Sequence, residues 1–385
     1  MSFGILTLIV ACGLIGPLLS GATRLAVPVV VGEIAAGVLV GQTGLREVNP
    51  ADPTIIFLSS VGFAMLMFVV GTRLPLRDAG LRRALDRAAI ASVLSFVIAV
   101  PGGWLVSHVT GLGHPAIFVL LLAASSSAVV MPIIQERELA GGEMLLVTAW
   151  IAVVDIATIV ALPLALAPSQ AARIAGGGVV VTVAAIGVFR FIHVTRHHRV
   201  VAALRRNSRL RGWALDLRLS LVVLFGLAAL ATRFDTSILI AGFAAGMIVS
   251  LAGEPRRLTD QMLGLAEGFF VPFFFVALGA KLNFRSLASS RTNIELMALL
   301  AAAIVACHLV VAIVMRMPWP AGMLASAQLG LPAGVVALGL AEHVLTPGEG
   351  AAIVAAAVIM LGVSSLGAVL LARSLPPAAA PAAPG

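Results

Sequence analysis

Long apolar runs alternate with short polar or basic segments along nearly the whole chain. Because a bilayer's hydrocarbon core is about 30 Å thick, a helix needs roughly 20 apolar residues to cross it. This pattern predicts an all-α polytopic membrane protein with about thirteen membrane-spanning helices. The predicted spans cover residues 3–21, 26–45, 54–72, 88–109, 114–134, 144–167, 174–194, 215–232, 236–252, 262–280, 293–315, 319–342 and 348–372.

Composition supports a membrane environment. Hydrophobic residues make up 60% of the 385 residues and charged residues only 11%, whereas an ordinary soluble domain has about 25% charged residues. The first apolar run begins at Phe3 without a basic segment before it, so we expect a retained span rather than a cleaved signal peptide. Cys12 and Cys307 both fall inside apolar runs and suggest neither a disulfide framework nor a metal site.

The basic residues are distributed unevenly between the two sides that these spans define. Loops after odd-numbered spans, together with the C-terminal segment, hold 17 of the 25 Lys and Arg residues, and loops after even-numbered spans hold 6. Cytoplasmic loops carry the excess of positive charge. We therefore predict a multi-pass protein of the cell membrane with the N-terminus outside and the C-terminus in the cytoplasm. The formal net charge of +8 indicates topology, not binding of nucleic acid.

Two segments lie outside the spans of the predicted membrane domain, which covers residues 1–375. Residues 196–212 form a basic cytoplasmic linker, which is either an interfacial helix or a solvated loop. Residues 376–385 are rich in Pro and Ala and are predicted to be a disordered tail.

Asp155 lies midway along the sixth predicted span, with no charged neighbour in sequence. A charge near the bilayer midplane costs at least about 2.5–3.5 kcal/mol, so it usually marks a function. A carboxylate there must be protonated, paired or bound to a cation. The alternative is a structural hydrogen bond or an ion pair that packs two helices.

His308 and Glu33 are the other titratable candidates at membrane depth. His308, in the eleventh span, either pairs with a carboxylate or relays a proton, although a lone histidine on a helix is more often a satisfied core residue. Glu33, in a Gly-rich helix, either lines the ion path or ties that helix to a neighbour. Gln328, in the twelfth span, is a second candidate for a residue that lines the path.

The fifth and twelfth spans carry helix-weakening residues near their middles. The fifth holds Ser125, Ser126 and Ser127, followed by Pro132, and the twelfth holds Gln328, Gly330, Pro332 and Gly334. Non-helical backbone at membrane depth survives only where it lines a cavity or is buried in protein. The alternative for the serines is small-residue helix packing.

The two interrupted spans are seven apart, so their units have opposite orientations in the membrane. Interrupted helices at matching positions of inverted halves point to a transporter site. Spans four to six and eleven to thirteen would form the paired units, with Asp155 and His308 on opposite ones. Carbonyl and hydroxyl oxygens at the two interruptions would complete the oxygen shell that a hard cation prefers.

Several motifs together resemble the monovalent cation/proton antiporter superfamily, with closer likeness to its sodium/proton exchanger and Kef-type branch. The resemblance covers nearly the whole membrane region and rests on four segments of this sequence. These are Pro28 to Gly41, Leu66 to Gly71, the serine triplet with Ala128-Val-Val, and Pro272-Phe-Phe-Phe to Gly279.

This resemblance implies a sodium/proton antiporter-like fold, with inverted repeats and two crossing discontinuous helices, and a homodimer. It implies that Asp155 is the ion- and proton-binding aspartate. It also implies a moving core, approximately residues 88–167 and 293–372, against a dimerisation scaffold. His308 matches a position where many relatives carry Lys or Arg paired to the aspartate.

The sequence departs from the family pattern at two positions. Val154 stands directly before Asp155, where electrogenic relatives carry an acid, so a one-for-one, electroneutral exchange is implied. Leu331 stands where Kef-type relatives carry glutamate, and that branch's nucleotide-binding domain is not in the sequence.

We therefore predict a secondary active antiporter that exchanges Na⁺ or K⁺ for H⁺ without a cofactor. A Kef-like potassium efflux channel and an organic-anion symporter on a related inverted-repeat fold are the alternatives. A membrane enzyme would need an acid pair, a metal cluster or a nucleophile constellation at membrane depth, and the sequence offers none.

Overall fold

The structure is a computed structural model of the chain. It describes residues 1–22, 29–73, 79–137, 139, 141–195, 198, 204, 207–208, 211, 213–234, 236–252 and 256–374. Every regular element in these residues is helical. Most of the predicted basic linker and the whole predicted tail, residues 376–385, lie outside the described residues.

Ten helices of the described residues are long and apolar enough to cross a membrane. The predicted count of thirteen is an approximation, because three of the predicted spans are not among these ten. Two of them contain only the shorter apolar helices α3 (Val29–Val40) and α12 (Ile238–Ala252). The third, residues 114–134, is divided into α6 (Pro115–Ala123) and α7 (Ser127–Glu136).

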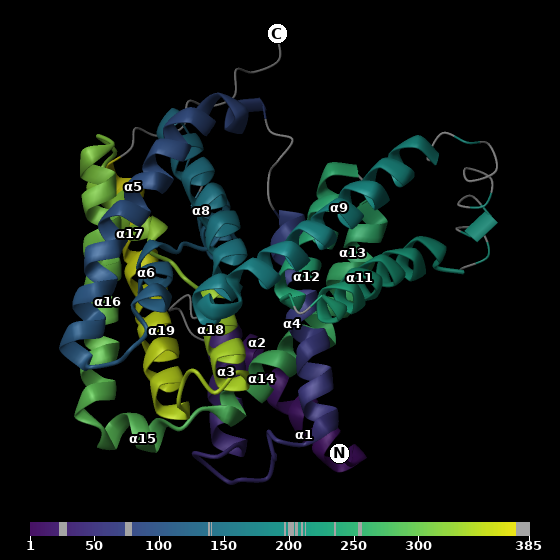
Figure 1. Ribbon diagram of the computed structural model, residues 1–385, viewed down its shortest axis with the longest axis horizontal. Coiled ribbons are helices and arrows are strands. Elements are labelled where there is room, and N and C mark those ends of the chain that lie inside the picture. The colour runs from purple at the N-terminus through teal and green to yellow at the C-terminus, as the bar shows by residue number, and fades with distance from the viewer. Residues whose placement is uncertain are drawn as a thin grey trace. The chain divides into compact units, whose positions relative to one another are not determined.

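The chain divides into two compact units, which we describe separately (Figure 1). Unit 1 comprises Met1–Leu76 and Pro163–Arg285, and unit 2 comprises Arg77–Leu162 and Ser286–Gly385. One boundary falls at Pro163 inside α8 (Gly142–Leu166), where proline removes a helical hydrogen bond.

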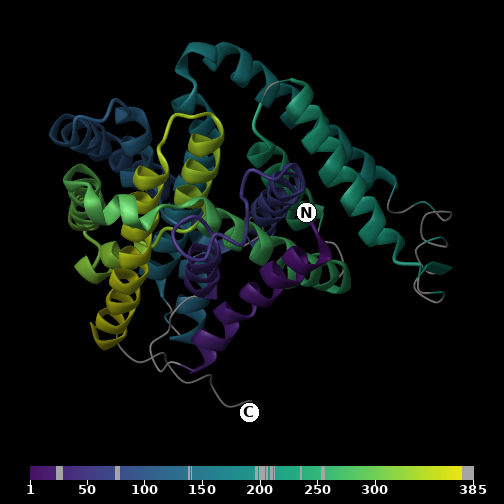
Figure 2. The same cartoon turned by 90° about the horizontal axis from the view of Figure 1, so that it is seen from below.

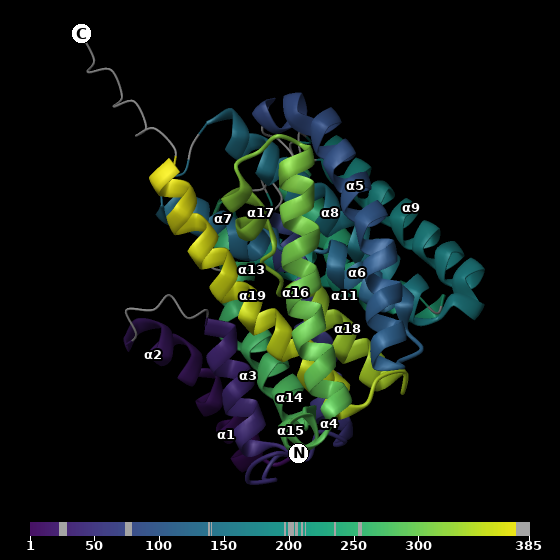
Figure 3. The same cartoon turned by 90° about the vertical axis from the view of Figure 1, so that its left-hand side faces the viewer.

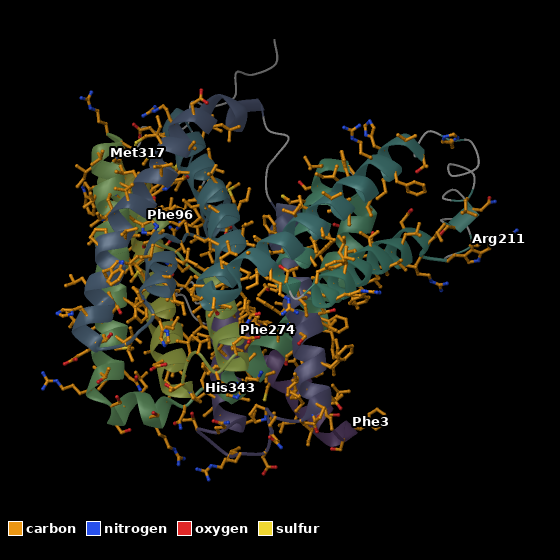
Figure 4. All side chains as sticks on the ribbon, in the orientation of Figure 1. Phe3, Phe96, Arg211, Phe274, Met317 and His343 are labelled. Atoms are coloured by element: carbon orange, nitrogen blue, oxygen red, sulfur yellow. The ribbon has the colours of Figure 1, made fainter. Side chains whose placement is uncertain are left out.

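Unit 1 is a bundle of close-packed apolar helices. Besides α3 and α12 it contains α1 (Phe3–Gly13), α2 (Ile15–Ala22), α4 (Pro53–Arg73), the 3₁₀ turn Pro168–Gln170, α9 (Ala171–Thr195), α11 (Leu215–Arg233), α13 (Arg256–Leu265), the π turn Ala266–Phe270 and α14 (Val271–Lys281). The helices α9 and α11 lie side by side (Figure 2). Phe274, labelled in Figure 4, stacks on Phe63 with ring centroids 5.2 Å apart, which joins α14 to α4.

Small residues set the helix spacing in unit 1. A Cβ added at Gly37 would lie 2.1 Å from the carbonyl oxygen of Val276, so α3 and α14 approach more closely than any larger residue allows. Such contacts are common between membrane helices, because packing rather than hydrophobicity drives their association. The Gly-rich segment that contains Glu33 is therefore a packing surface on the side of Gly37.

Unit 2 repeats one pattern twice. The first repeat is α5 (Ala79–Thr110), α6 and α7, then α8, and the second is α16 (Arg291–Val314), α17 (Trp319–Ala325) and α18 (Gly330–Ala341), then α19 (Pro347–Ser374). The short α15 (Phe284–Ser289) precedes the second repeat. Figure 3 shows α19 crossing α16 obliquely, and the two helices pack together. Each repeat thus has a broken helix between two long ones.

The two interruptions differ slightly from the predicted positions. The first break covers residues 124–126, ahead of Pro132, which lies inside α7. The second break covers residues 326–329, and Gly330, Pro332 and Gly334 lie in the first turns of α18. Proline is tolerated in a first turn because the N–H it lacks would have no partner within the helix.

Candidate ion-binding site

Hydrogen bonds join the two breaks directly within unit 2. The Ser125 hydroxyl donates to the carbonyl oxygen of Ala325 at 2.5 Å. In return, the Gln328 amide nitrogen donates to the carbonyl oxygens of Leu121, at 2.5 Å, and Ala124, at 2.9 Å. Carbonyls at the carboxyl end of a helix have no partner within that helix. The two broken helices therefore satisfy each other's backbone at the point where they cross.

Asp155 lies against the first break. Its Oδ2 accepts a hydrogen bond from the Ser127 backbone N–H at 3.1 Å and another from the Ser127 hydroxyl at 2.5 Å. Ser127 is the first residue of α7, so the carboxylate lies at the positive end of that helix's dipole. With only 3% of the residue exposed, these donors replace water as the partners of the negative charge.

The three serines of the triplet have different roles in this arrangement. Ser125 bonds the opposite break and Ser127 bonds Asp155. Ser126 contributes its backbone carbonyl, which accepts from the N–H groups of Val129 and Val130 and so starts α7. Its buried hydroxyl makes no hydrogen bond among the described residues, so it keeps an oxygen atom available at the break.

His308 is fully enclosed in unit 2 and makes no hydrogen bond with Asp155. Its Nδ1 lies 2.9 Å from the carbonyl oxygen of Ile304, one turn earlier in α16. The ring also lies 5.6 Å from the Trp150 ring, centroid to centroid, whereas Nε2 has no partner among the described residues. In this conformation the described residues contain no ion pair between His308 and Asp155.

Glu33 belongs to unit 1. It is buried in α3, and its Oε2 has no hydrogen-bond partner in the described part of the chain. Its Cγ lies 2.9 Å from the position of a Cβ built at Gly16, so the acid packs where α2 and α3 meet. Oε2 therefore does not join α3 to a neighbouring helix through a hydrogen bond.

Comparisons with known proteins agree with the helical pattern and the broken-helix site. The family described as sodium/hydrogen exchanger, transmembrane, matches residues 8–373 of the chain. The chain belongs to the sodium/hydrogen exchanger family. This confirms the predicted membership of the cation/proton antiporter superfamily, a class of transporters rather than enzymes.

Individual relatives share the exchanger-family pattern at low identity. YjbQ of Bacillus subtilis, assigned as a sodium/proton antiporter, is 26% identical over 92% of this chain and 60% of its own length. The glutathione-regulated potassium-efflux protein KefC of Cronobacter sakazakii is 27% identical over 70% of this chain and 43% of its own length. The chain thus spans about 60% or less of these two relatives.

A solved structure supports the predicted fold class. The sodium/proton antiporter MjNhaP1 of Methanocaldococcus jannaschii superimposes with a TM-score of 0.60, over 96% of this chain and 95% of that one, at 18% identity. At this identity the match establishes the fold alone. The predicted antiporter-like fold, with two crossing discontinuous helices, is confirmed.

The exchanger-family site has supporting residues that the sequence did not single out. The Trp150 indole N–H donates to the Ser95 hydroxyl at 2.9 Å, which fixes the indole beside His308. The Ser364 hydroxyl donates to the Leu324 carbonyl at 2.8 Å, near the end of α17. Lone serines inside apolar spans were the available signal, but most such serines bond their own helix.

Two residues next to the site, Val154 and Leu331, are apolar. Val154, directly before Asp155, is fully buried in the apolar core of unit 2, to which Met317, labelled in Figure 4, also belongs. Leu331 is likewise buried. The described residues contain no group of three His, Cys, Asp or Glu side chains that could hold a metal ion. The site therefore offers one carboxylate surrounded by neutral oxygens.

Proposed function

We propose that the chain is a secondary active antiporter that exchanges a monovalent cation, Na⁺ or K⁺, for H⁺ at Asp155. The observation that carries the proposal is the position of this buried carboxylate, held by Ser127 at the amino end of α7. Membership of the sodium/hydrogen exchanger family gives the class of transport.

Exchange follows because the Asp155 carboxylate binds only one ion at a time. Asp155 binds either a proton or a cation, and each neutralises the buried charge, whereas the bare carboxylate resists movement through a low-dielectric region. The site therefore crosses only when loaded, and the two ions travel in opposite directions. Because Val154 supplies no second acid, we propose an electroneutral exchange of one cation for one proton.

The remaining residues have supporting roles in the proposal. Ser125, Ser126 and Ser127 supply hydroxyl and carbonyl oxygens at the first break. His308 acts as a proton relay rather than a fixed charge partner, because Nε2 is unpartnered and the ring lies away from any carboxylate bond. Glu33 lines a path through unit 1, which its unpartnered Oε2 favours over a structural tie.

The unit division fits a moving core and a scaffold. We propose that unit 2, which contains both breaks, is the transport core, and that unit 1 provides the dimerisation scaffold of a homodimer. The excess of basic residues in odd-numbered loops supports a cell-membrane location with the N-terminus outside.

Reconstitution in lipid vesicles tests the proposal. Addition of Na⁺ or K⁺ to vesicles with an imposed pH gradient should release protons in proportion to the cation, as followed by a pH-sensitive dye. Cation flux that is insensitive to the pH gradient would favour the channel, as the name of KefC suggests for that relative. Flux that requires an organic anion would favour the symporter.

A further inference from the structure

Gln328 joins the two broken helices where they cross, and it does so only through the NH₂ group of its side-chain amide. Both hydrogens of the NH₂ group are used, on the carbonyls of Leu121 and Ala124. The opposite orientation would place the amide oxygen against these two carbonyl oxygens, where no hydrogen is available. The hydrogen-bond network therefore fixes the orientation of the amide.

The other end of that amide has no partner. Gln328 is 1% exposed, and its Oε1 is enclosed without a hydrogen bond from any described residue. A buried acceptor without a donor costs about 1–3 kcal/mol, and folded proteins rarely leave one. Gln328 thus presents a fixed, neutral oxygen at the second break that lacks a positive partner.

Two further oxygens at the first break also have no hydrogen bond, although neither is as completely enclosed as Oε1. Asp155 uses Oδ2 for both bonds to Ser127, and its Oδ1 accepts none from the described residues. The Ser126 hydroxyl makes none either. The residues that carry these oxygens meet at the first break, because Ser126 lies in the chain between Ala124, which bonds Gln328, and Ser127, which bonds Asp155.

We infer that Gln328 is a specificity-determining residue of this site, whose Oε1 is a neutral ligand for the transported monovalent cation. The inference rests on the proposed function. Hard cations prefer oxygen ligands, and selectivity between them depends on the number and spacing of those oxygens. The amide hydrogens hold the ligand at a fixed place, while the proton, which needs only Asp155, does not use it.

Substitutions at Gln328 separate the oxygen from the amide hydrogens. Gln328→Met removes both, whereas Gln328→Glu keeps an oxygen and removes the amide hydrogens. Ser92→Ala serves as the control, because it removes a buried hydroxyl that bonds only its own helix, α5, without removing an unpartnered oxygen. Each full-length variant is reconstituted, and proton release is titrated with Na⁺, K⁺ and Li⁺ at one pH.

Gln328→Met should raise the half-saturating cation concentration about tenfold, the effect of losing one contact to a charge. Gln328→Glu should keep more of the affinity than Gln328→Met, because its protonated carboxyl group still donates to one of the two carbonyls and keeps an oxygen at the free end. Ser92→Ala should leave the affinity unchanged. If Gln328→Met and Gln328→Glu raise the half-saturating cation concentration equally, Gln328 serves only to join the two broken helices. A changed pH profile with unchanged cation affinity would instead make Oε1 an acceptor for a proton on His308, and would overturn the inference.

A binding measurement distinguishes this inference from the proposed function. Thermal unfolding of the purified protein in detergent should shift upward with added cation, and Gln328→Met should lose that shift. If the unaltered protein binds cations but exchanges no protons, the antiporter proposal fails while the ligand inference stands. Should Gln328→Met not fold, Gln328→Asn withdraws the same oxygen by one methylene and is measured in the same way.

Discussion

Ser127 donates to Asp155 twice, from its backbone N–H at 3.1 Å and from its hydroxyl at 2.5 Å, and both bonds go to Oδ2. The carboxylate therefore acts as the cap of α7. The helix break leaves the N–H group at the start of α7 free to donate to the acid. Oδ1 accepts no bond from the described residues, so one oxygen is structural and the other is available for an ion. Local folding and ion binding thus depend on the same side chain.

Replacement of Asp155 by Asn should abolish cation-dependent proton movement. Asparagine keeps the size and an oxygen that can accept from Ser127, but it can neither bind a proton at neutral pH nor carry the charge that attracts a cation. Proton release from vesicles should fall to the level of empty liposomes, while the thermal unfolding midpoint stays close to that of the unaltered protein.

Glu143→Gln is the matched control for this change. Glu143 is an exposed acid in the first turn of the same helix, α8, so its loss should leave exchange intact. Cation-driven proton flux that persists in Asp155→Asn would refute the assignment of the carrier residue.

Ser127→Ala should weaken the site without destroying it. The backbone N–H remains, but the hydroxyl bond to the carboxylate is lost, and hydrogen bonds to charged groups contribute about 1.5–3 kcal/mol. We expect a slower maximal exchange rate and an altered cation affinity, measured by titration in vesicles. Ser127→Thr retains the hydroxyl and should restore exchange, whereas equal damage from Ala and Thr would indicate a packing role.

His308→Gln should change the pH dependence of exchange without abolishing it. Glutamine keeps polar atoms near the Ile304 carbonyl but, unlike an imidazole, cannot take up and release a proton. Exchange is measured over a range of pH at a saturating cation concentration. A pH profile that superimposes on that of the unaltered protein would return His308 to a purely structural role beside Trp150.

The sequence was sufficient to predict the helical class, the two interrupted spans and the inverted pairing, because hydropathy and helix-breaking residues report directly on membrane structure. It placed the breaks less accurately. Pro332 indicated an interruption, but proline is compatible with a helix's first turn, so the break precedes it, at residues 326–329.

Contacts between distant residues were beyond the reach of the sequence. The bonds of Gln328 to Leu121 and Ala124 join positions more than 200 apart, and Trp150 reaches Ser95 across 55. No local pattern encodes such pairs, since they depend on how helices cross. For the same reason, the sequence left open whether His308 pairs with Asp155.

The spacing between α16 and α17 provides a stability prediction at Gly322. A Cβ added there would lie 2.6 Å from the carbonyl oxygen of His308, in the backbone of the neighbouring helix. Gly322→Ala must therefore push the two helices apart, and overpacking of this kind typically costs about 1–3 kcal/mol. We expect a lower thermal unfolding midpoint in detergent.

Gly226 in α11 provides the comparison, because it is exposed and a Cβ there would meet no atom within 4 Å. Alanine is the better helix former by about 1 kcal/mol, so Gly226→Ala should leave the midpoint unchanged or raise it. The same chemical change would then act in opposite directions at two sites. Equal midpoints for the two variants would show that α16 and α17 do not approach as closely as this packing requires, and the support that α17 gives to the second break would need to be reconsidered.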